Sequence, residues 1–198
     1  MESFFVIIMA VTSITGLTFI IERGLALRWN KVIPRSLENA VEACRTPGDL
    51  PMLRRVCEQN PSAFSRLLQT AEQHLDLPRE DNESAVQSRA RTEIVKLERG
   101  LIVLEIVVGI APLLGLVGTI QGMIVLFGSL GQSGLNDNAV LARGISLILG
   151  FTMTGLLIAI PSLIAWSYYS KKVENMAIEM ESLVTEFFRR QYRASAKK

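Results

Sequence analysis

GIAPLLGLVGTIQGMIVLF, from Gly109 to Phe127, is an apolar stretch that carries four glycines, one proline and one threonine. A helix that only faces lipid has no need of so many small residues. In hydrocarbon, helices associate largely through close backbone contact at glycine and other small residues. Gly118 and Gly122 form such a pair, and Gly115 lies almost on the same face. Thr119 adds a hydroxyl to that face, so the stretch predicts a packed wall of an assembly rather than a passive anchor.

Three segments are apolar enough to cross a membrane. Phe4 to Ile21 holds eighteen residues without charge, which suffices for a bilayer core of about 30 Å. Glu2 stands where a signal peptide has basic residues, so we expect a retained span. The second span is 101–127, interrupted only by Glu105, and the third, 144–166, has no charge. The sequence therefore predicts a three-span protein.

Lysine and arginine predict the orientation. Thirteen of them lie between Glu22 and Gly100, seven follow Trp166, and only Arg143 lies between the second and third spans. The positive-inside rule puts the amino terminus in the periplasm and the basic segments in the cytoplasm. The expected order is a first span at 1–21, a cytoplasmic helical loop at 22–100, a second span at 101–127, a short periplasmic loop at 128–143, a third span at 144–166 and a cytoplasmic helical tail at 167–198.

The cytoplasmic parts are predicted to be helical, which gives an all-α membrane protein with two spans extended far into the cytoplasm. The stretch 80–100 has helix-forming composition and no breaker before Gly100, so we expect it to run straight into the second span. In the tail, apolar residues recur at helical spacing: Val173, Met176, Met180, Leu183, Val184 and Phe187. We interpret this methionine-rich stripe as subunit packing rather than a ligand site, because methionine commonly fills such interfaces.

Several function classes are not supported by the sequence. His74 is the one histidine and no CxxC pair is present, so we expect no metal site and no cofactor. Cys44 and Cys57 fall in the predicted cytoplasmic loop, where no disulfide is expected. Neither polar segment has paired carboxylates, a nucleophile with its base or a phosphate loop, so an enzyme is not expected. Basic residues alternate with acids, which disfavours nucleic-acid binding.

Four motifs in order resemble one family. They are IIER at 20–23, LERG at 97–100, APLLGLVGTIQGM at 111–123 and TGLLIAIPSLIAWSYY at 154–169. The chain resembles the ExbB/TolQ/MotA family of proton-channel subunits, in its three-span ExbB/TolQ branch. The resemblance covers essentially the whole chain.

The resemblance implies a function that composition does not. It implies a multi-pass protein of the bacterial inner membrane, forming a homopentameric ring around a dimer of an ExbD/TolR-like single-span partner. Such a motor couples the proton-motive force to work in the periplasm or at the outer membrane. The protonatable aspartate belongs to the partner, and Thr119 and Thr152 match the threonines that the ring places near it. The process driven, and the choice between protons and sodium ions, stay open.

The spacing of the two threonines gives a second argument. Each lies eight residues inside the outer end of its predicted span, which is about 12 Å at 1.5 Å per residue. Two hydroxyls at one depth on neighbouring helices are suited to line a hydrated path. The alternative is that each hydroxyl bonds the i−4 carbonyl of its own helix.

One position departs from the family pattern. Leu147 stands where well-studied members carry a glutamate, fourteen residues before Pro161. A non-conducting membrane scaffold of the same architecture is therefore the alternative function. Glu105 is the one acid inside a predicted span, and it is interpreted either as a proton-collecting group at the cytoplasmic exit or as an interfacial carboxylate. Pro112 and Pro161 are expected to kink their helices.

Overall fold

A computed structural model describes residues 2–133 and 138–195 of the chain, and these residues form helices without any strand. The chain divides into two compact units. The span unit comprises Met1–Arg23 and Gly100–Tyr168, and the polar unit comprises Gly24–Arg99 and Tyr169–Lys198. Each unit is built from segments that are far apart in the sequence.

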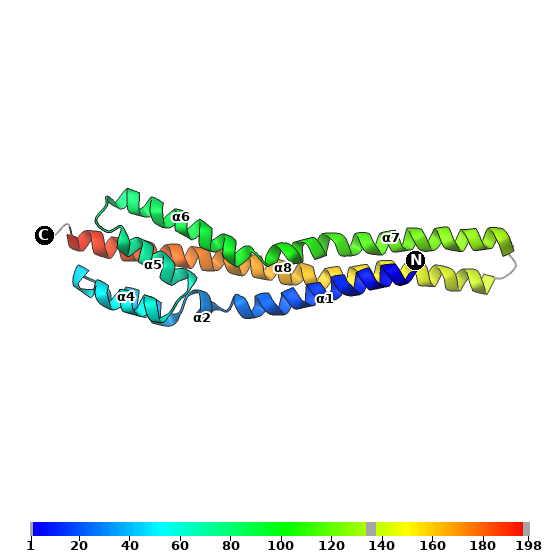
Figure 1. Ribbon diagram of the computed structural model, residues 1–198, viewed down its shortest axis with the longest axis horizontal. Coiled ribbons are helices and arrows are strands. Elements are labelled where there is room, and N and C mark those ends of the chain that lie inside the picture. Colours follow the sequence, from blue (N-terminus) through cyan, green and yellow to red (C-terminus); the bar gives the residue numbers. More distant parts are fainter. Residues whose placement is uncertain (1, 134–137, 196–198) are drawn as a thin grey trace. The chain divides into compact units, whose positions relative to one another are not determined.

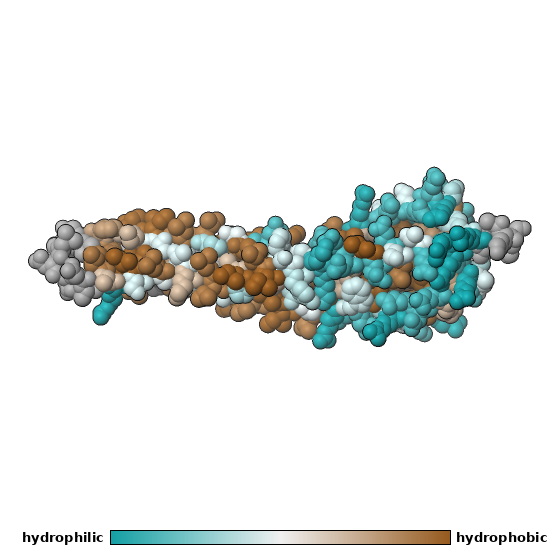
Figure 2. Space-filling model, turned by 180° about the vertical axis from the view of Figure 1, so that it is seen from behind, coloured by the Kyte–Doolittle hydropathy of each residue, from teal (hydrophilic) through white to brown (hydrophobic). Residues whose placement is uncertain are grey.

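The span unit contains three helices that lie side by side (Figure 1). They are α1 (Glu2–Ala26), α7 (Leu101–Ser133) and the first part of α8 (Asn138–Ser195). All three are long and apolar enough to cross a membrane. Figure 2 shows hydrophobic side chains over most of this unit's visible surface. The expected all-α fold with three candidate spans is confirmed.

The polar unit surrounds the second part of α8 with short helices. These are α2 (Trp29–Val32), α3 (Arg35–Ala43), a 3₁₀ turn (Pro47–Asp49), α4 (Leu50–Gln59), α5 (Ala63–Gln73) and α6 (Arg79–Glu98). Each of α3, α4 and α5 is amphipathic and buries one apolar face. Burying those faces together stabilises helices that are too short to persist alone.

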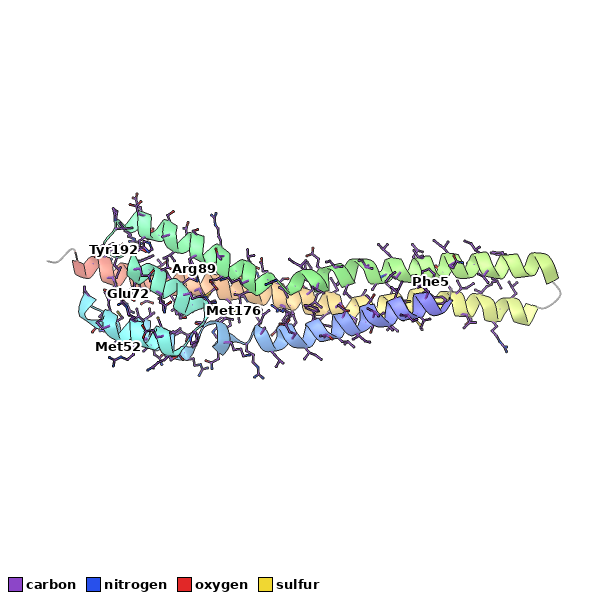
Figure 3. The ribbon with its side chains drawn as sticks, in the orientation of Figure 1. Phe5, Met52, Glu72, Arg89, Met176 and Tyr192 are labelled. Carbon is purple, nitrogen blue, oxygen red and sulfur yellow. The ribbon has the colours of Figure 1, made fainter. Side chains whose placement is uncertain are left out.

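Large side chains fill the core of the polar unit. Met176, Met180 and Phe187 of α8 are almost completely buried there, together with Phe64 and Leu68 of α5. Figure 3 labels Met176 at this position. The methionine-rich stripe therefore packs within its own chain, and the expectation of subunit packing was wrong for these residues. Helical periodicity identifies an apolar face, but it does not say which partner covers that face.

A buried carboxylate joins α5 to α6. The Glu93 side chain is only 1% exposed, and it accepts hydrogen bonds from Arg66 at 2.6 Å and from Lys96 at 2.9 Å, with Arg89 at 3.2 Å. Burial alone would raise the pKa of Glu93, but these bonds and positive charges outweigh burial and hold the pKa below its usual value. The carboxylate therefore stays ionised at neutral pH.

Both cysteines are free and buried in the polar unit. Burial raises the pKa of the Cys44 thiol to about 11 and that of the Cys57 thiol to about 12. Few thiolates form at neutral pH, so both groups behave as small core residues.

The helices differ from the sequence-based expectation at two places. A turn at Arg99 and Gly100 separates α6 from α7, so the expected continuous helix is interrupted. Gly100 lies against the Arg23 side chain, where a Cβ atom would collide with the guanidinium. At the other end, α7 continues to residue 133 and α8 starts at residue 138, inside the expected periplasmic loop, whose residues 134–137 lie outside the described part.

Candidate functional site

The glycines of α7 pack against α8 of the same chain. A Cβ atom at Gly115 would lie 2.8 Å from the Phe151 carbonyl oxygen and 3.1 Å from the Thr152 Cα. A Cβ atom at Gly155 would lie 2.6 Å from the Ala111 carbonyl oxygen. Backbone atoms cannot move aside as a flexible side chain can. The two helices therefore touch backbone to backbone, which is the close approach that glycine permits in membrane helices.

The contact continues towards the loop between the two helices. Gly118 lies against the Phe151 ring and Gly122 against Ile148, with would-be Cβ distances of 3.0 Å and 2.7 Å. Further along, Gly144 of α8 lies against Leu126. These pairs define one antiparallel register along α7 and α8, which we call the glycine seam (the contacts between 111–126 and 144–155).

The glycine seam places Thr119 and Thr152 within about one helical turn of each other along the helix axes. Gly118 contacts Phe151, and because the two helices are antiparallel, Thr119 and Thr152, which follow these residues, are displaced in opposite directions by about 1.5 Å each. Both threonines are half-buried. The seam thus fixes the height of one threonine against the other through rigid backbone contacts.

The two hydroxyls differ in their hydrogen bonds. Thr119 donates its proton to the Leu116 carbonyl oxygen at 2.6 Å, within its own helix. Thr154, two residues beyond Thr152, likewise donates to the Gly150 carbonyl oxygen at 2.8 Å. Among the described residues, Thr152 makes no such bond. A hydroxyl bonded to the backbone of its own helix was the alternative to a hydroxyl that lines a path. Thr119 makes such a bond, with the i−3 carbonyl in place of the expected i−4 carbonyl.

The helix α1 contacts both α7 and α8 beyond the glycine seam, on the side away from the loop that joins α7 to α8. Gly16 of α1 lies against Val107 of α7 and Ser162 of α8, at would-be Cβ distances of 3.3 Å and 3.1 Å. Ser162 is buried and donates to the Ile158 carbonyl oxygen at 2.9 Å. Because its polarity is satisfied within α8, this serine serves as a small contact residue between the three helices.

The remaining predicted residues lie away from the seam contacts. Glu105 is exposed near the start of α7, and Leu147 is 69% exposed on α8. Pro112 and Pro161 lie inside α7 and α8, and both helices continue through them. The structure thus places Gly115, Gly118 and Gly122 in one contact between α7 and α8. Thr119 and Thr152 lie beside that contact, whereas Glu105 lies away from it.

Sequence reasoning did not single out Phe151, Gly155 or Ser162. Gly155 lies inside the TGLL motif, and its spacing from Gly115 across an antiparallel helix pair was the available signal. Phe151 had no such signal, because its role is to fill the space left by Gly118, and that pairing depends on the register of two helices.

A comparison with known families adds a second line of evidence. The model of the MotA/TolQ/ExbB proton channel family matches residues 59–182, which contain α6, α7 and most of α8. This chain belongs to the MotA/TolQ/ExbB proton channel family. The match includes the whole glycine seam and both threonines.

Individual relatives agree with this assignment. The chain is 30% identical over 189 residues to the Tol-Pal system protein TolQ of Pseudomonas aeruginosa, covering 88% of this chain and 80% of that protein. It is 35% identical over 89 residues to the biopolymer transport protein ExbB of Helicobacter pylori, covering 45% of this chain and 61% of the relative. It is 31% identical over 97 residues to the biopolymer transport protein ExbB of Aquifex aeolicus, covering 49% of this chain and 65% of the relative. The matched region thus spans less than two thirds of either ExbB protein.

Proposed function

We propose that this MotA/TolQ/ExbB family member is an ion-channel motor subunit of the bacterial inner membrane. Five copies form a ring around a dimer of an ExbD/TolR-like single-span protein. Ions that move down the proton-motive force between ring and partner drive work in the periplasm or at the outer membrane. The amino terminus faces the periplasm, and the polar unit faces the cytoplasm, where thirteen of the lysines and arginines precede the second span.

The observation that carries the proposal is the glycine seam, which holds Thr119 and Thr152 within about one helical turn of each other. Rigid backbone contacts at Gly115 and Gly155 hold α7 and α8 as one hairpin. A moving partner helix therefore meets Thr119 and Thr152 at a constant height in every subunit. Such a constant height is required if the partner's acidic group is to meet the threonines of one ring subunit after another in the same way.

The hydrogen bonds give the two threonines different chemistry in this scheme. Thr119 has committed its proton to Leu116, so its free lone pairs accept a hydrogen bond from water or from a protonated carboxyl group. Thr152 keeps its proton available and donates to the ionised carboxylate. One residue thus favours the neutral form of the partner's acid, and the other favours the charged form.

The function is tested with the complex in lipid vesicles. The chain is co-expressed with an ExbD/TolR-like single-span protein, the complex is purified, and proton uptake is measured with an internal pH-sensitive dye under an imposed potential. We expect uptake by the complex and none by the partner alone. A complex that assembles fully but conducts no protons or sodium ions would refute the motor.

A non-conducting scaffold is the second candidate, and Leu147 is the observation that favours it. The side chain carries no proton and is exposed on α8. In the motor model Leu147→Ala leaves uptake close to normal, because the partner's acid and the two threonines carry the ion. In the scaffold model the unmodified complex already fails to conduct, so the vesicle experiment separates the two candidates.

A further inference from the structure

A basic segment directly follows the first span. Residues 23–37 contain four cations and no acid, and the first of them, Arg23, pairs with Glu22 at 2.5 Å. The other three, Arg28, Lys31 and Arg35, are exposed and form no ion pair with another residue in the described part of the chain. Their charge is therefore available to an external anion.

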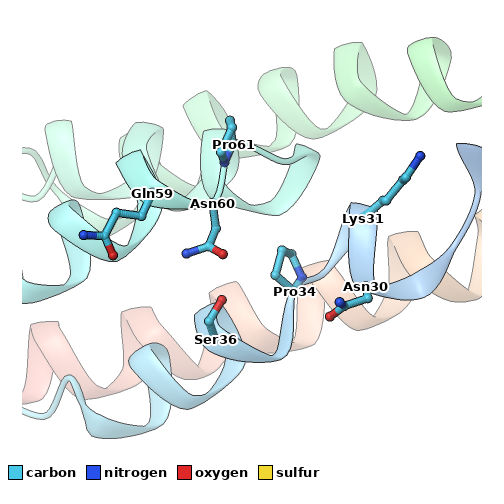
Figure 4. Close-up of a pocket in the computed structure, with 7 residues that line it drawn as sticks. All are labelled: Asn30, Lys31, Pro34, Ser36, Gln59, Asn60 and Pro61. Carbon is cyan, nitrogen blue, oxygen red and sulfur yellow. The ribbon is translucent and has the colours of Figure 1, made fainter.

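A cavity opens beside this segment in the polar unit. It has a volume of about 500 Å³, and Figure 4 shows the side chains that line it. They are one cation, three amides, one hydroxyl and two prolines, with no carboxylate among them: Lys31, Asn30, Gln59, Asn60, Ser36, Pro34 and Pro61. An acid-free cavity with a cation and several donors suits a phosphate group.

Most of these donors are unused. The Asn60 amide donates to the Val56 carbonyl oxygen at 2.9 Å. The side chains of Asn30, Lys31 and Ser36 make no hydrogen bond within the ranges 2–133 and 138–195. A bound phosphate oxygen would gain these donors without breaking an existing bond.

The position of the cavity along the chain limits where its ligand comes from. The first candidate span ends at Ala26, and Lys31 follows five residues later. At about 3.5 Å per residue, the Lys31 backbone lies within roughly 17 Å of the end of the span. Trp29, between them, is 40% exposed, and exposed tryptophan is typical of the membrane–water interface. This stretch therefore lies within reach of the lipid headgroups.

We propose that the cavity, with Arg28, Lys31 and Arg35 around it, binds the phosphate of an anionic phospholipid headgroup. The site would hold the end of α1 at the membrane surface. It requires only that α1 spans a membrane, so it stands apart from the motor function.

Tryptophan fluorescence tests the site directly. The chain has two tryptophans, so Trp166→Phe leaves Trp29 as the one reporter. This variant is reconstituted into vesicles in which either phosphatidylglycerol or phosphatidylcholine carries brominated chains that quench tryptophan. Each cation near an anionic surface is worth about a fivefold change in binding. We expect brominated phosphatidylglycerol to be favoured near Trp29 at least fivefold.

Two variants in the Trp166→Phe background separate the cavity from surface charge in general. The triple variant R28Q/K31Q/R35Q is expected to abolish the preference, whereas R45Q/R55Q/R91Q, which removes the same charge from other exposed positions of the polar unit, keeps it. Ser36→Leu fills the cavity without changing charge and is expected to reduce the preference about fivefold, as the loss of one cation would.

Three results would overturn the proposal. The first is equal quenching by both lipids, or none, in the Trp166→Phe protein. The second is a preference that survives Ser36→Leu, since surface charge would then suffice without the cavity. The third is an equal loss of the preference in R28Q/K31Q/R35Q and R45Q/R55Q/R91Q, which would assign the preference to surface charge in general. Displacement by millimolar inorganic phosphate, but not by chloride of equal ionic strength, is expected, because free phosphate competes with the headgroup phosphate for the cavity.

Discussion

The two units of this protein hold their helices together by opposite means. In the span unit, α7 and α8 meet at glycines, with the backbone at Gly115 directly against Phe151 and Thr152. In the polar unit, the helices are held by large buried side chains such as Phe187 and by the charges around Glu93. In water, burial of large apolar groups supplies the free energy of packing. In lipid it supplies little, so close backbone contact takes its place.

The two kinds of packing leave different surfaces exposed on the two units. A seam of backbone contacts leaves the outer faces of α7 and of the first part of α8 uncovered, and most large apolar side chains in these two segments are exposed in the single chain. Those faces are available to lipid or to another apolar helix. The polar unit, in contrast, uses its apolar faces internally and presents mostly hydrophilic residues on its surface (Figure 2).

The largest expected loss of stability follows from opening the core of the polar unit. Phe187→Ala is expected to lower the free energy of unfolding by about 3–5 kcal/mol, because it leaves a cavity among buried side chains. Ile178→Ala on the same helix is the control, since Ile178 is largely exposed and should change stability by about 0.5 kcal/mol or less. Chemical denaturation in detergent, followed by circular dichroism, measures both. Equal effects would show that the stripe on α8 is not a core.

An added methyl group in the glycine seam is expected to have a smaller effect. Gly155→Ala places a Cβ atom against the Ala111 carbonyl oxygen, and overpacking of this kind costs about 1–3 kcal/mol. Gly150→Ala, on the same helix, meets nothing within 4 Å and should be neutral or slightly stabilising. Thermal unfolding of the two detergent-solubilised variants compares them. If the Gly155→Ala protein is as stable as the Gly150→Ala protein, close contact at Gly155 does not contribute to the packing of α7 against α8.

Loss of the buried carboxylate is expected to have the smallest effect. Glu93→Gln should cost about 1–2 kcal/mol at neutral pH, because the three cations around it are partly exposed and solvent screens them. Glu181→Gln, at an exposed position of α8, is the control.

The pH dependence of this contribution has a definite sign. Because the folded-state pKa of Glu93 is lowered, its stabilisation is present above the ordinary glutamate pKa of about 4.3 and is lost as pH falls through the folded value. The difference between the unmodified protein and Glu93→Gln should therefore be constant from pH 8 to pH 6 and shrink below pH 4. A difference that fell between pH 8 and pH 6 would contradict the lowered pKa.

The sequence predicted the spans more completely than the contacts. Long uncharged runs identify membrane helices because a bilayer core admits few charges, and all three runs are candidate spans in the structure. The glycines predicted close contact, but spacing alone does not say whether Gly118 faces its own chain or another. The structure shows Phe151 of the same chain against it.

Long-range partners explain most of what the sequence did not predict. Arg66 and Glu93 are twenty-seven residues apart on different helices, so no local pattern marks their ion pair. Likewise, the side chain against Gly100 is that of Arg23, which comes from another helix. For the candidate site, the motif predicted both threonines, whereas their unequal hydrogen bonds depend on the local geometry of each helix.

The most direct test of the account is proton uptake by the reconstituted complex with valine at each threonine. Thr119→Val and Thr152→Val keep the shape of the side chain and remove a hydroxyl worth about 1–3 kcal/mol, which predicts roughly five- to hundredfold slower uptake with normal assembly. Thr154→Val is the matched control on α8, because Thr154 lies two residues from Thr152 and therefore on another face of the helix, and its side chain is exposed. We expect slow uptake for the first two variants, recovery with serine at either position, and near-normal uptake for the third. Uptake at the unmodified rate in both Thr119→Val and Thr152→Val would contradict this expectation.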